Sequence, residues 1–240
     1  MLADGPKIPV LDHGYIRLIE TYGSDEGIIE AARMSTNKGF LGWGTPEAPG
    51  DEKLLRYLME NRHDTPLEMA GMIIELQAPI MVFREWHRHR TQSYNEMSAR
   101  YTPLPDVNYI PTPERCLMVQ SGQNKQAQGI TDGLTHEQVV TWLTHLEYAY
   151  ETAQAVYAEG LAIGIPKELA RLPVPVARYS RMRAHANLRN WLAFLTLRSD
   201  VALHGKKAQW EIRQYANALA DPLIAEAFPR TYELFCQRAS

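Results

Sequence analysis

Residues 69–90, MAGMIIELQAPIMVFREWHRHR, combine the pattern of a strand with that of a helix. Residues 69–77 are mostly apolar and predict a strand. Pro79 suits the first turn of a helix, and residues 80–90 carry a predicted helix that begins apolar and ends strongly basic. The segment therefore predicts a strand that leads directly into a helix with a cationic end.

The rest of the chain mixes predicted strands and helices in irregular order. Tyr15–Glu20 alternates like a half-buried strand, and residues 136–162 repeat apolar side chains at helical spacing over several turns. Residues 102–132 are rich in Pro, Gly, Asn and Gln and predict irregular structure. The other predicted elements are a strand over 176–183, a helix over 24–34 with a Ser24-Asp25 cap, a helix from an Asp51 cap to about His63–Pro66, a helix over 188–198 with an Asn187 cap, a helix over 208–220, and a short last helix from Asp221-Pro222.

This order of elements predicts the fold class. Short βαβ units are few, so we expect an α+β fold with a mainly antiparallel sheet and packed helices. No GxGxxG or GxxxxGK[ST] motif follows a predicted strand, which argues against a Rossmann fold and against a P-loop.

Charge and cysteine content argue against several classes of protein. The net charge of −3 comes from 25 basic and 28 acidic residues, so we expect no nucleic-acid binding and only local anion sites. Cys116 and Cys236 are the only cysteines, which excludes a disulfide framework and predicts reduced thiols in the cytosol. No leader pattern and no run of about eighteen apolar residues occurs. We therefore expect a cytoplasmic protein that does not enter membranes.

The densest chemical signal lies in residues 88–101, RHRTQSYNEMSARY. Arginine forks bind phosphate oxygens two at a time, serine and asparagine add neutral donors, and Glu96 could orient an arginine or accept from a sugar hydroxyl or base imide. These groups suit a nucleotide. The alternative is a solvated surface on which neighbouring charges merely pair, Arg84, Arg88 and Arg90 with Glu75, Glu85 and Glu96. Residue types alone leave both interpretations open.

Two further interpretations of this segment concern a metal and a nucleophile. His87 and His89 would resemble a metal-binding pair on a strand, but on a helix residues two apart point to opposite sides, so we predict no metal. Ser98 could be a nucleophile with His89 as its base, but no spacing shows that the two meet. A serine among arginines more often binds phosphate, and we favour that role.

The spacing within residues 88–101 is specific. The Arg-His-Arg triplet is followed by seven residues and then Ser98, with Asn-Glu shortly before that serine and Arg-Tyr after it. This arrangement resembles the signature of the flavin-dependent thymidylate synthases. Other segments resemble the same family in the same order: HDTPLEMA at 63–70, PLPDVNYIP at 103–111, SGQNKQAQG at 121–129, Glu168–Arg171, NLRNWLAFLTLR at 187–198 and AQWEIRQYA at 208–216. A chance motif match would not cover so much of the chain.

The resemblance implies an activity and an assembly. It implies methylation of dUMP to dTMP, with methylenetetrahydrofolate as the one-carbon donor and FAD, reduced by NADPH, as the hydride source. No enzyme nucleophile is required, which agrees with a binding role for Ser98. The resemblance also implies the fold typical of this family, in a single domain over 1–240, and a homotetramer whose FAD sites are shared between subunits.

The resemblance also assigns residues. The positions that match FAD contacts are Thr65, Arg88, His89, Arg90, Glu96, Asn187 and Arg189. The positions that match the dUMP site are Glu85, Arg88, Glu96, Met97, Ser98, Ala99, Arg100, Arg171 and Arg198. Arg198 matches an arginine thought to favour ionisation at uracil N3, and a fixed cation beside a developing anion is electrostatic catalysis. We therefore expect Arg198 to be the catalytic residue.

Three features depart from the usual pattern of the family. Ala193 stands five residues before Arg198, where relatives commonly carry Asn or His, so one polar flavin contact is missing. The segment 199–207 is longer than usual, and Lys207 stands where a histidine often precedes Ala-Gln. Glu85 replaces a frequent Gln, and a carboxylate buried there would need an arginine partner or a raised pKa.

Two other functions compete with this one. A nucleotide- or nucleic-acid-binding module could use Arg88–Arg90 as a phosphate clamp without turnover, although a near-neutral chain lacks the extended basic surface that long nucleic acids need. A flavoprotein that oxidises NADPH with dUMP as an effector could have lost methyl transfer through Ala193 and the altered 199–207 segment. Bound flavin distinguishes the two flavoproteins from the binding module, and dTMP formation distinguishes the synthase from the NADPH oxidase.

Overall fold

The fold is built on a five-stranded antiparallel sheet. The computed structural model describes residues 5–45, 47–118 and 133–239. The strands lie in the order β1-β2-β3-β5-β4, and every neighbouring pair is antiparallel. Their bounds are β1 Ile8–Val10, β2 Gly14–Tyr22, β3 Gly71–Pro79, β4 Ser93–Glu96 and β5 Tyr179–Asn187. The predicted α+β class with an antiparallel sheet is confirmed.

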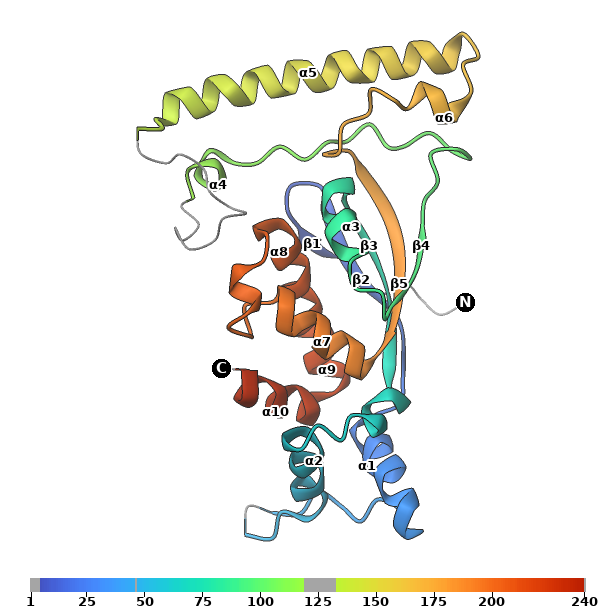
Figure 1. Ribbon diagram of the computed structural model, residues 1–240, viewed down its shortest axis with the longest axis vertical. Coiled ribbons are helices and arrows are strands. Elements are labelled where there is room, and N and C mark those ends of the chain that lie inside the picture. The colour runs from blue at the N-terminus through green and yellow to red at the C-terminus, as the bar shows by residue number, and fades with distance from the viewer. Residues whose placement is uncertain (1–4, 46, 119–132, 240) are drawn as a thin grey trace.

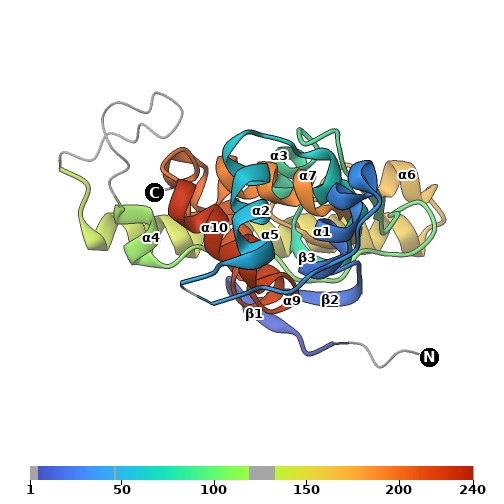
Figure 2. The same cartoon turned by 90° about the horizontal axis from the view of Figure 1, so that it is seen from below.

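The helices surround this sheet unevenly. In Figure 1, α5 lies across one end of the molecule, α1 and α2 lie at the other end, and α7 and α8 pack on the sheet between them. Figure 2 shows α2 and α10 side by side, where Arg56 Nη1 donates to Gln237 Oε1 at 3.1 Å. The helices are α1 Asp25–Arg33, α2 Gly50–Glu60, α3 Ile80–Trp86, α4 Pro113–Leu117, α5 His136–Ala162, α6 Lys167–Ala170, α7 Leu188–Arg198, α8 Trp210–Ala218, α9 Ala225–Ala227 and α10 Pro229–Ala239, with short turns η1 Met34–Thr36, η2 Thr65–Met69, η3 Gly205–Lys207 and η4 Leu219–Ile224.

The core lies between the sheet and the helices α3, α7 and α8. Met72, Ile74 and Leu76 alternate along β3 and are fully buried on its inner face. Trp86 of α3 packs on Phe194 of α7, with ring centroids 4.5 Å apart. Each large apolar side chain buried in this way contributes about 1.5–3 kcal/mol. The core therefore fixes α3 and α7 relative to each other, and both helices carry predicted site residues.

Local capping signals located several elements correctly. The Ser24 side chain accepts from Gly27 N, and the Asn187 side chain accepts from Asn190 N, so both predicted caps are confirmed. The helix over 136–162 has the predicted bounds, and Thr135 forms a capping box with Gln138. The predicted strands over 15–20, 69–77 and 176–183 are present as β2, β3 and β5, with boundaries shifted by one to four residues.

Helix α3 is shorter than predicted, because it ends at Trp86 and not after the basic residues. The buried Trp86 indole N–H donates to Gln92 Oε1 at 2.9 Å, and the Tyr94 hydroxyl donates to the Trp86 and His89 carbonyl oxygens. These contacts turn the chain back so that β4 can pair with β5. His87 and His89 therefore lie in a turn, and the helical argument against a metal pair is wrong.

The predicted role of Asp51 is also wrong. Helix α2 begins at Gly50, and the Asp51 carboxylate is fully buried inside the protein. It accepts from the backbone N–H groups of Leu41 and Gly42 and forms an ion pair with Arg33. These contacts hold the pKa of Asp51 below its usual value against the opposing effect of burial, which is the largest single influence. The Asp51 carboxylate therefore stabilises the loop around Leu41 and Gly42 and does not cap a helix.

Two segments near the C-terminus and the middle of the chain differ from their predictions. A short helical segment follows Asp221-Pro222 as predicted, because the backbone is non-helical at Asp221 and helical from there to the end of α9. It is not the last helix, since α10 begins at Pro229, where the Asp25 carboxylate accepts from the backbone N–H groups of Arg230 and Thr231. Within the predicted irregular segment, residues 113–117 form the short helix α4. Residues 119–132, which include SGQNKQAQG, lie outside the described residues.

The described ranges limit what can be said of membranes and metals. Within them, no helix combines the length and the apolar character that crossing a bilayer requires. The same ranges contain no group of three or more His, Cys, Asp or Glu side chains that could hold a metal ion. Cys116 and Cys236 do not form a disulfide.

Candidate active site

A cavity of about 510 Å³ lies beside the end of β4. Glu96, Met97, Ser98 and Ala99 line it from one segment, and Arg171 reaches it from the turn after α6. Its remaining lining is apolar, from Ile80, Leu104, Leu172 and Val174. Five of the nine predicted dUMP-binding residues therefore meet at one place. We refer to this space as the β4 cavity.

The lining segment of the β4 cavity is fixed by backbone contacts on both sides. Met97 N donates to Arg181 O at 2.8 Å, which continues the pairing of β4 with β5. The Ser98 side chain accepts from Arg100 N at 3.3 Å and shapes a tight turn. Two contacts join this turn to α6: Lys167 Nζ donates to Tyr101 O at 2.9 Å, and Arg100 lies 3.0 Å from Glu168. Arg171 follows α6, so these contacts help to place it.

The basic residues around α3 do not form the surface ion pairs that the alternative interpretation requires. Glu75 binds Arg17 at 2.8 Å and Arg183 at 3.5 Å, and Glu85 binds Arg198. Within the described ranges, no carboxylate lies within 4.0 Å of the side chains of Arg84, Arg88 and Arg90. The alternative of surface ion pairs with these carboxylates is therefore wrong, and Arg88 and Arg90 are exposed cations.

Arg198, the last residue of α7, has two contacts with the region of α3. Its Nε donates to Nε2 of His89 at 3.0 Å, and its Nη1 lies 2.9 Å from Oε2 of Glu85. His89 packs edge-on against Phe194, with ring centroids 4.7 Å apart. Burial and, secondly, the charge of Arg198 lower the pKa of His89 to about 4. Glu85 thus has the arginine partner that a carboxylate in this place needs.

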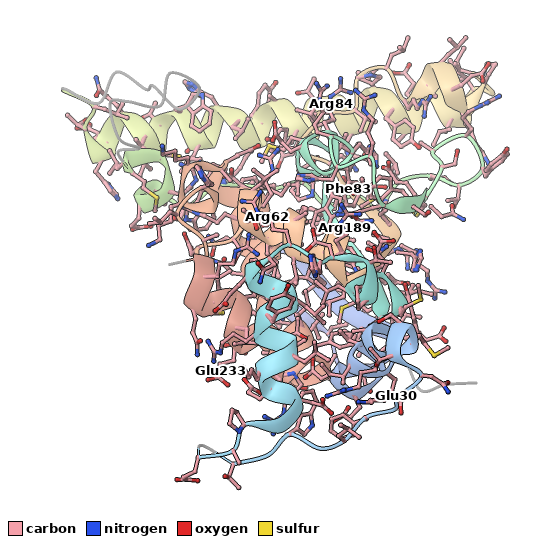
Figure 3. All side chains as sticks on the ribbon, turned by 60° about the horizontal axis from the view of Figure 1, so that its bottom comes forward. Glu30, Arg62, Phe83, Arg84, Arg189 and Glu233 are labelled. Atoms are coloured by element: carbon pink, nitrogen blue, oxygen red, sulfur yellow. The ribbon has the colours of Figure 1, made fainter. Side chains whose placement is uncertain are left out.

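A second cavity, of about 600 Å³, lies along one side of α7. Arg189, Ala193 and Thr196 line it from that helix, and Asp64 lines it from the residue before Thr65. Figure 3 labels Arg62 and Arg189, which both line this cavity. Its other lining residues are Met59, Leu67, Leu192, Ala202, Leu203, His204, Phe235 and Arg238. We refer to this space as the α7 cavity.

The predicted flavin residues near the α7 cavity have several roles in the fold. Arg189 forms ion pairs with Glu68 and, at 3.7 Å, with Asp64. Asn187 caps α7 through its side-chain oxygen, and Thr65 begins η2 with an exposed side chain. Ala193, where a polar residue was expected, presents only a methyl group to the cavity.

The predicted site residues of one chain therefore fall into three groups. They lie at the β4 cavity, around Arg198, and at the α7 cavity. Arg88, Arg100 and Arg198 are not among the described residues that line the β4 cavity. Sequence reasoning missed the apolar lining and the two cations Arg62 and Arg238, because no local motif marks them.

Two solved structures of a nucleotide methylase are similar to this chain. The UMP/dUMP methylase PolB from Streptomyces cacaoi, bound with 5-Br dUMP, is similar at a TM-score of 0.80 and 33% identity, over 96% of this chain and 97% of that chain. The same methylase bound with 5-Br UMP is similar at a TM-score of 0.77 and 34% identity, over 98% of both chains.

Sequence comparison identifies the family of this chain. The model of the family described as thymidylate synthase complementing protein matches residues 17–230. The flavin-dependent thymidylate synthase of Thermosipho africanus is 38% identical over 96% of this chain and 94% of its own length. That of Thermotoga neapolitana is 37% identical over 97% of this chain and 95% of its own length. The chain therefore belongs to the thymidylate synthase complementing protein family, the flavin-dependent thymidylate synthases.

Proposed function

We propose that this chain catalyses the reductive methylation of dUMP to dTMP, with methylenetetrahydrofolate as the one-carbon donor. FAD would be the bound cofactor and NADPH its reductant. Membership of the family supports the reaction and the flavin. The observation that supports the proposal most directly is the β4 cavity, because it brings Arg171 to the Glu96–Ala99 segment across a long stretch of sequence.

The β4 cavity suits the proposed nucleotide. Ser98 and Arg171 line the cavity and would offer a hydroxyl and a guanidinium group to a phosphate. Arg88 and Arg100 match the same site in the family but do not line this cavity, and Arg100 pairs with Glu168. Glu96 would accept from a sugar hydroxyl or from the base imide. Met97, Ala99 and the apolar lining residues would cover the uracil ring.

The proposed flavin residues are Thr65, Arg88, His89, Arg90, Glu96, Asn187 and Arg189. Their chemistry fits FAD: Arg88 and Arg90 are exposed and offer forks for a diphosphate, and Leu67, Leu192 and Phe235 give the α7 cavity an apolar wall for a flat ring system. When bound and reduced by NADPH, the flavin would supply the hydride that completes the methyl group.

Arg198 is the proposed catalytic residue. Loss of the N3 proton of uracil to solvent would raise the electron density at C5. C5 would then attack the methylene carbon of the folate, and a bond from that carbon to a folate nitrogen would break. A guanidinium group close to the ring stabilises the developing anion without taking a proton itself. The contacts with Glu85 and His89 keep Arg198 in place, so little reorganisation is needed when the nucleotide binds.

We also propose a single domain over 1–240, a homotetramer with shared sites, and a cytoplasmic location. The division of the site residues into three groups supports a partner subunit that completes each site. Large apolar side chains on α5 and after it are exposed, which favours protein contacts there: Val140, Trp142, Tyr148, Val156, Ile163, Leu169 and Leu172. Light scattering of the purified protein tests this directly, since a fully active monomer would contradict it.

The first experiment is a visible spectrum of the purified protein, followed under anaerobic NADPH with and without dUMP. We expect flavin bands that bleach, and dTMP on addition of methylenetetrahydrofolate. A protein that binds no flavin even after addition of FAD would contradict the proposal and leave the phosphate-clamp module. Bleaching without any dTMP would instead identify the NADPH oxidase with dUMP as effector.

UMP is a second candidate substrate. The similar PolB structures carry the description UMP/dUMP methylase and contain 5-bromo derivatives of both nucleotides. Parallel assays with UMP and dUMP at equal concentration decide between them. A kcat/KM for UMP equal to or above that for dUMP would make this chain a methylase of both nucleotides.

A further inference from the structure

Two sides of the Arg198 guanidinium group are held by different kinds of partner. His89 accepts from Nε at 3.0 Å, and Glu85 lies 2.9 Å from Nη1. The Arg198 side chain is 19% exposed and the Glu85 side chain 40% exposed. Both partners are half-buried, but His89 packs against Phe194, while the Glu85 carboxylate remains partly open to solvent and to a ligand.

His89 orients Arg198 without cancelling its charge. Because Nε2 accepts from an arginine, the imidazole ring is neutral and carries its proton on Nδ1. A protonated ring would lose this hydrogen bond and bring two cations together. The edge contact with Phe194 holds the ring in the orientation that the hydrogen bond needs.

Glu85 acts differently, because it pairs a full negative charge with Arg198. A ligand beside the pair experiences the guanidinium charge reduced by the carboxylate, so an anion forming there is stabilised less than by Arg198 alone. The other acidic groups and the histidine on elements packed against α3 and α7 have partners of their own: Glu75 with Arg17, Asp64 and Glu68 with Arg189, Asp200 with Arg213, Glu211 with Arg115, and His185 with Tyr22. The remaining charged groups there add positive charge: Arg84, Arg88, Arg90, Lys206 and Lys207. Among the described residues, Glu85 is therefore the one carboxylate that directly opposes Arg198.

We propose that Glu85 is a positioning residue that holds Arg198 in place and at the same time limits its electrostatic effect on the uracil ring. This inference rests on the proposed function, since the charge of Arg198 affects the rate only if the ring ionises. Glutamine is the informative replacement, because its amide oxygen can still accept from Nη1 while the negative charge is gone. Alanine removes both the contact and the charge.

Binding of 5-fluoro-dUMP tests the proposal without turnover. Fluorine makes the ring N–H more acidic, so ¹⁹F NMR of the bound nucleotide can follow its ionisation with pH. In Glu85→Gln we expect the ring to ionise about one pH unit lower than in the parent holoenzyme, because a carboxylate near the ring no longer opposes its negative charge. Equal titration midpoints in the two proteins would overturn the proposal.

The rate of dTMP formation gives a second measurement. The rising limb of kcat against pH should move to lower pH in Glu85→Gln by a similar amount, while kcat falls about 10–100-fold in Glu85→Ala as Arg198 loses its anchor. Glu30→Gln is the matched control, because Glu30 is exposed on α1 at the far end of the molecule from α3 (Figures 1 and 3). Its profile should match that of the parent.

The outcomes separate this inference from the proposed function. If the parent forms dTMP but Glu85→Gln has the parental pH profile and NMR midpoint, only the role of Glu85 is refuted. If the parent forms no dTMP from dUMP and methylenetetrahydrofolate, the proposed function itself is refuted.

Discussion

Arg198 differs from Arg88 and Arg90 in how the protein holds its side chain. Arg198 is mostly buried and is held by Glu85 and His89. Arg88 and Arg90 are exposed, and among the described residues no carboxylate lies within 4.0 Å of either. A fixed cation can stabilise a charge that forms during reaction at no cost in reorganisation, whereas a free cation suits an anion that must bind and leave. The difference separates a catalytic arginine from binding arginines within one basic region.

Loss of the fixed arginine should have the largest effect. In Arg198→Ala we expect kcat for dTMP formation to fall about 10²–10³-fold, because the cation beside the developing anion is gone. FAD content and reduction of the flavin by NADPH should remain close to those of the parent. Arg56→Ala, a surface variant on α2, is the matched control. Near-normal turnover in Arg198→Ala would show that the comparison assigns the wrong arginine to catalysis.

Loss of an exposed arginine at the β4 cavity, Arg171, should affect binding more than chemistry. In Arg171→Ala we expect KM for dUMP to rise about 10–100-fold, the usual effect of losing one charge-assisted hydrogen bond, with a smaller change in kcat. Initial rates over a range of dUMP concentrations give both constants. If kcat falls as steeply as in Arg198→Ala while KM stays constant, the distinction between fixed and free arginines does not hold.

Local signals were sufficient for much of the fold. The caps at Ser24 and Asn187 depend on residues within three positions, and the helical spacing of apolar residues marks 136–162, so these helices were located well. The end of α3 was misplaced, because it depends on the hydrogen bond between Trp86 and Gln92 and on the pairing of β4 with β5. These contacts exist only in the folded sheet, so helical propensity could not reveal them.

The candidate site also depends on contacts between residues far apart in sequence, which local signals do not reveal. The motif of residues 88–101 identified the family, and the β4 cavity contains its Glu96–Ala99 segment. The partners of Arg198 were not predicted, since His89 lies 109 residues away in sequence. The interpretation of Glu85 as a surface partner of a neighbouring arginine failed for the same reason. Residue types near in sequence suggested one pairing, and α7 supplied a different arginine.

Ser98 extends the comparison between Arg198 and the binding arginines, because it is a neutral group proposed to bind the same nucleotide. In Ser98→Ala we expect dUMP to bind about 3–10-fold more weakly, as for loss of one neutral hydrogen bond, with kcat largely kept. Part of this effect comes from the turn, where the Ser98 hydroxyl accepts from Arg100 N. Equilibrium titration with dUMP measures the change. Complete loss of turnover would instead revive the nucleophile interpretation.

The smallest expected effect concerns the neutral partner of Arg198. The pKa of His89 is lowered from 6.5 to about 4, first by burial and then by the charge of Arg198. Between these two values the unfolded chain binds a proton that the folded protein does not, so the free energy of unfolding decreases as the pH falls through this window. In His89→Gln this contribution is absent, and the decrease should be less steep.

Urea unfolding at several pH values between 6.5 and about 4 measures the slopes for parent and variant. His145→Gln, on an exposed position of α5, is the matched control and should keep the parental slope. Equal slopes for His89→Gln and the parent would mean that His89 is protonated equally in both states, and therefore that it does not hold Arg198 as a neutral acceptor. A shallower slope in His89→Gln alone would show that His89 is uncharged in the folded protein, as an acceptor from Arg198 must be.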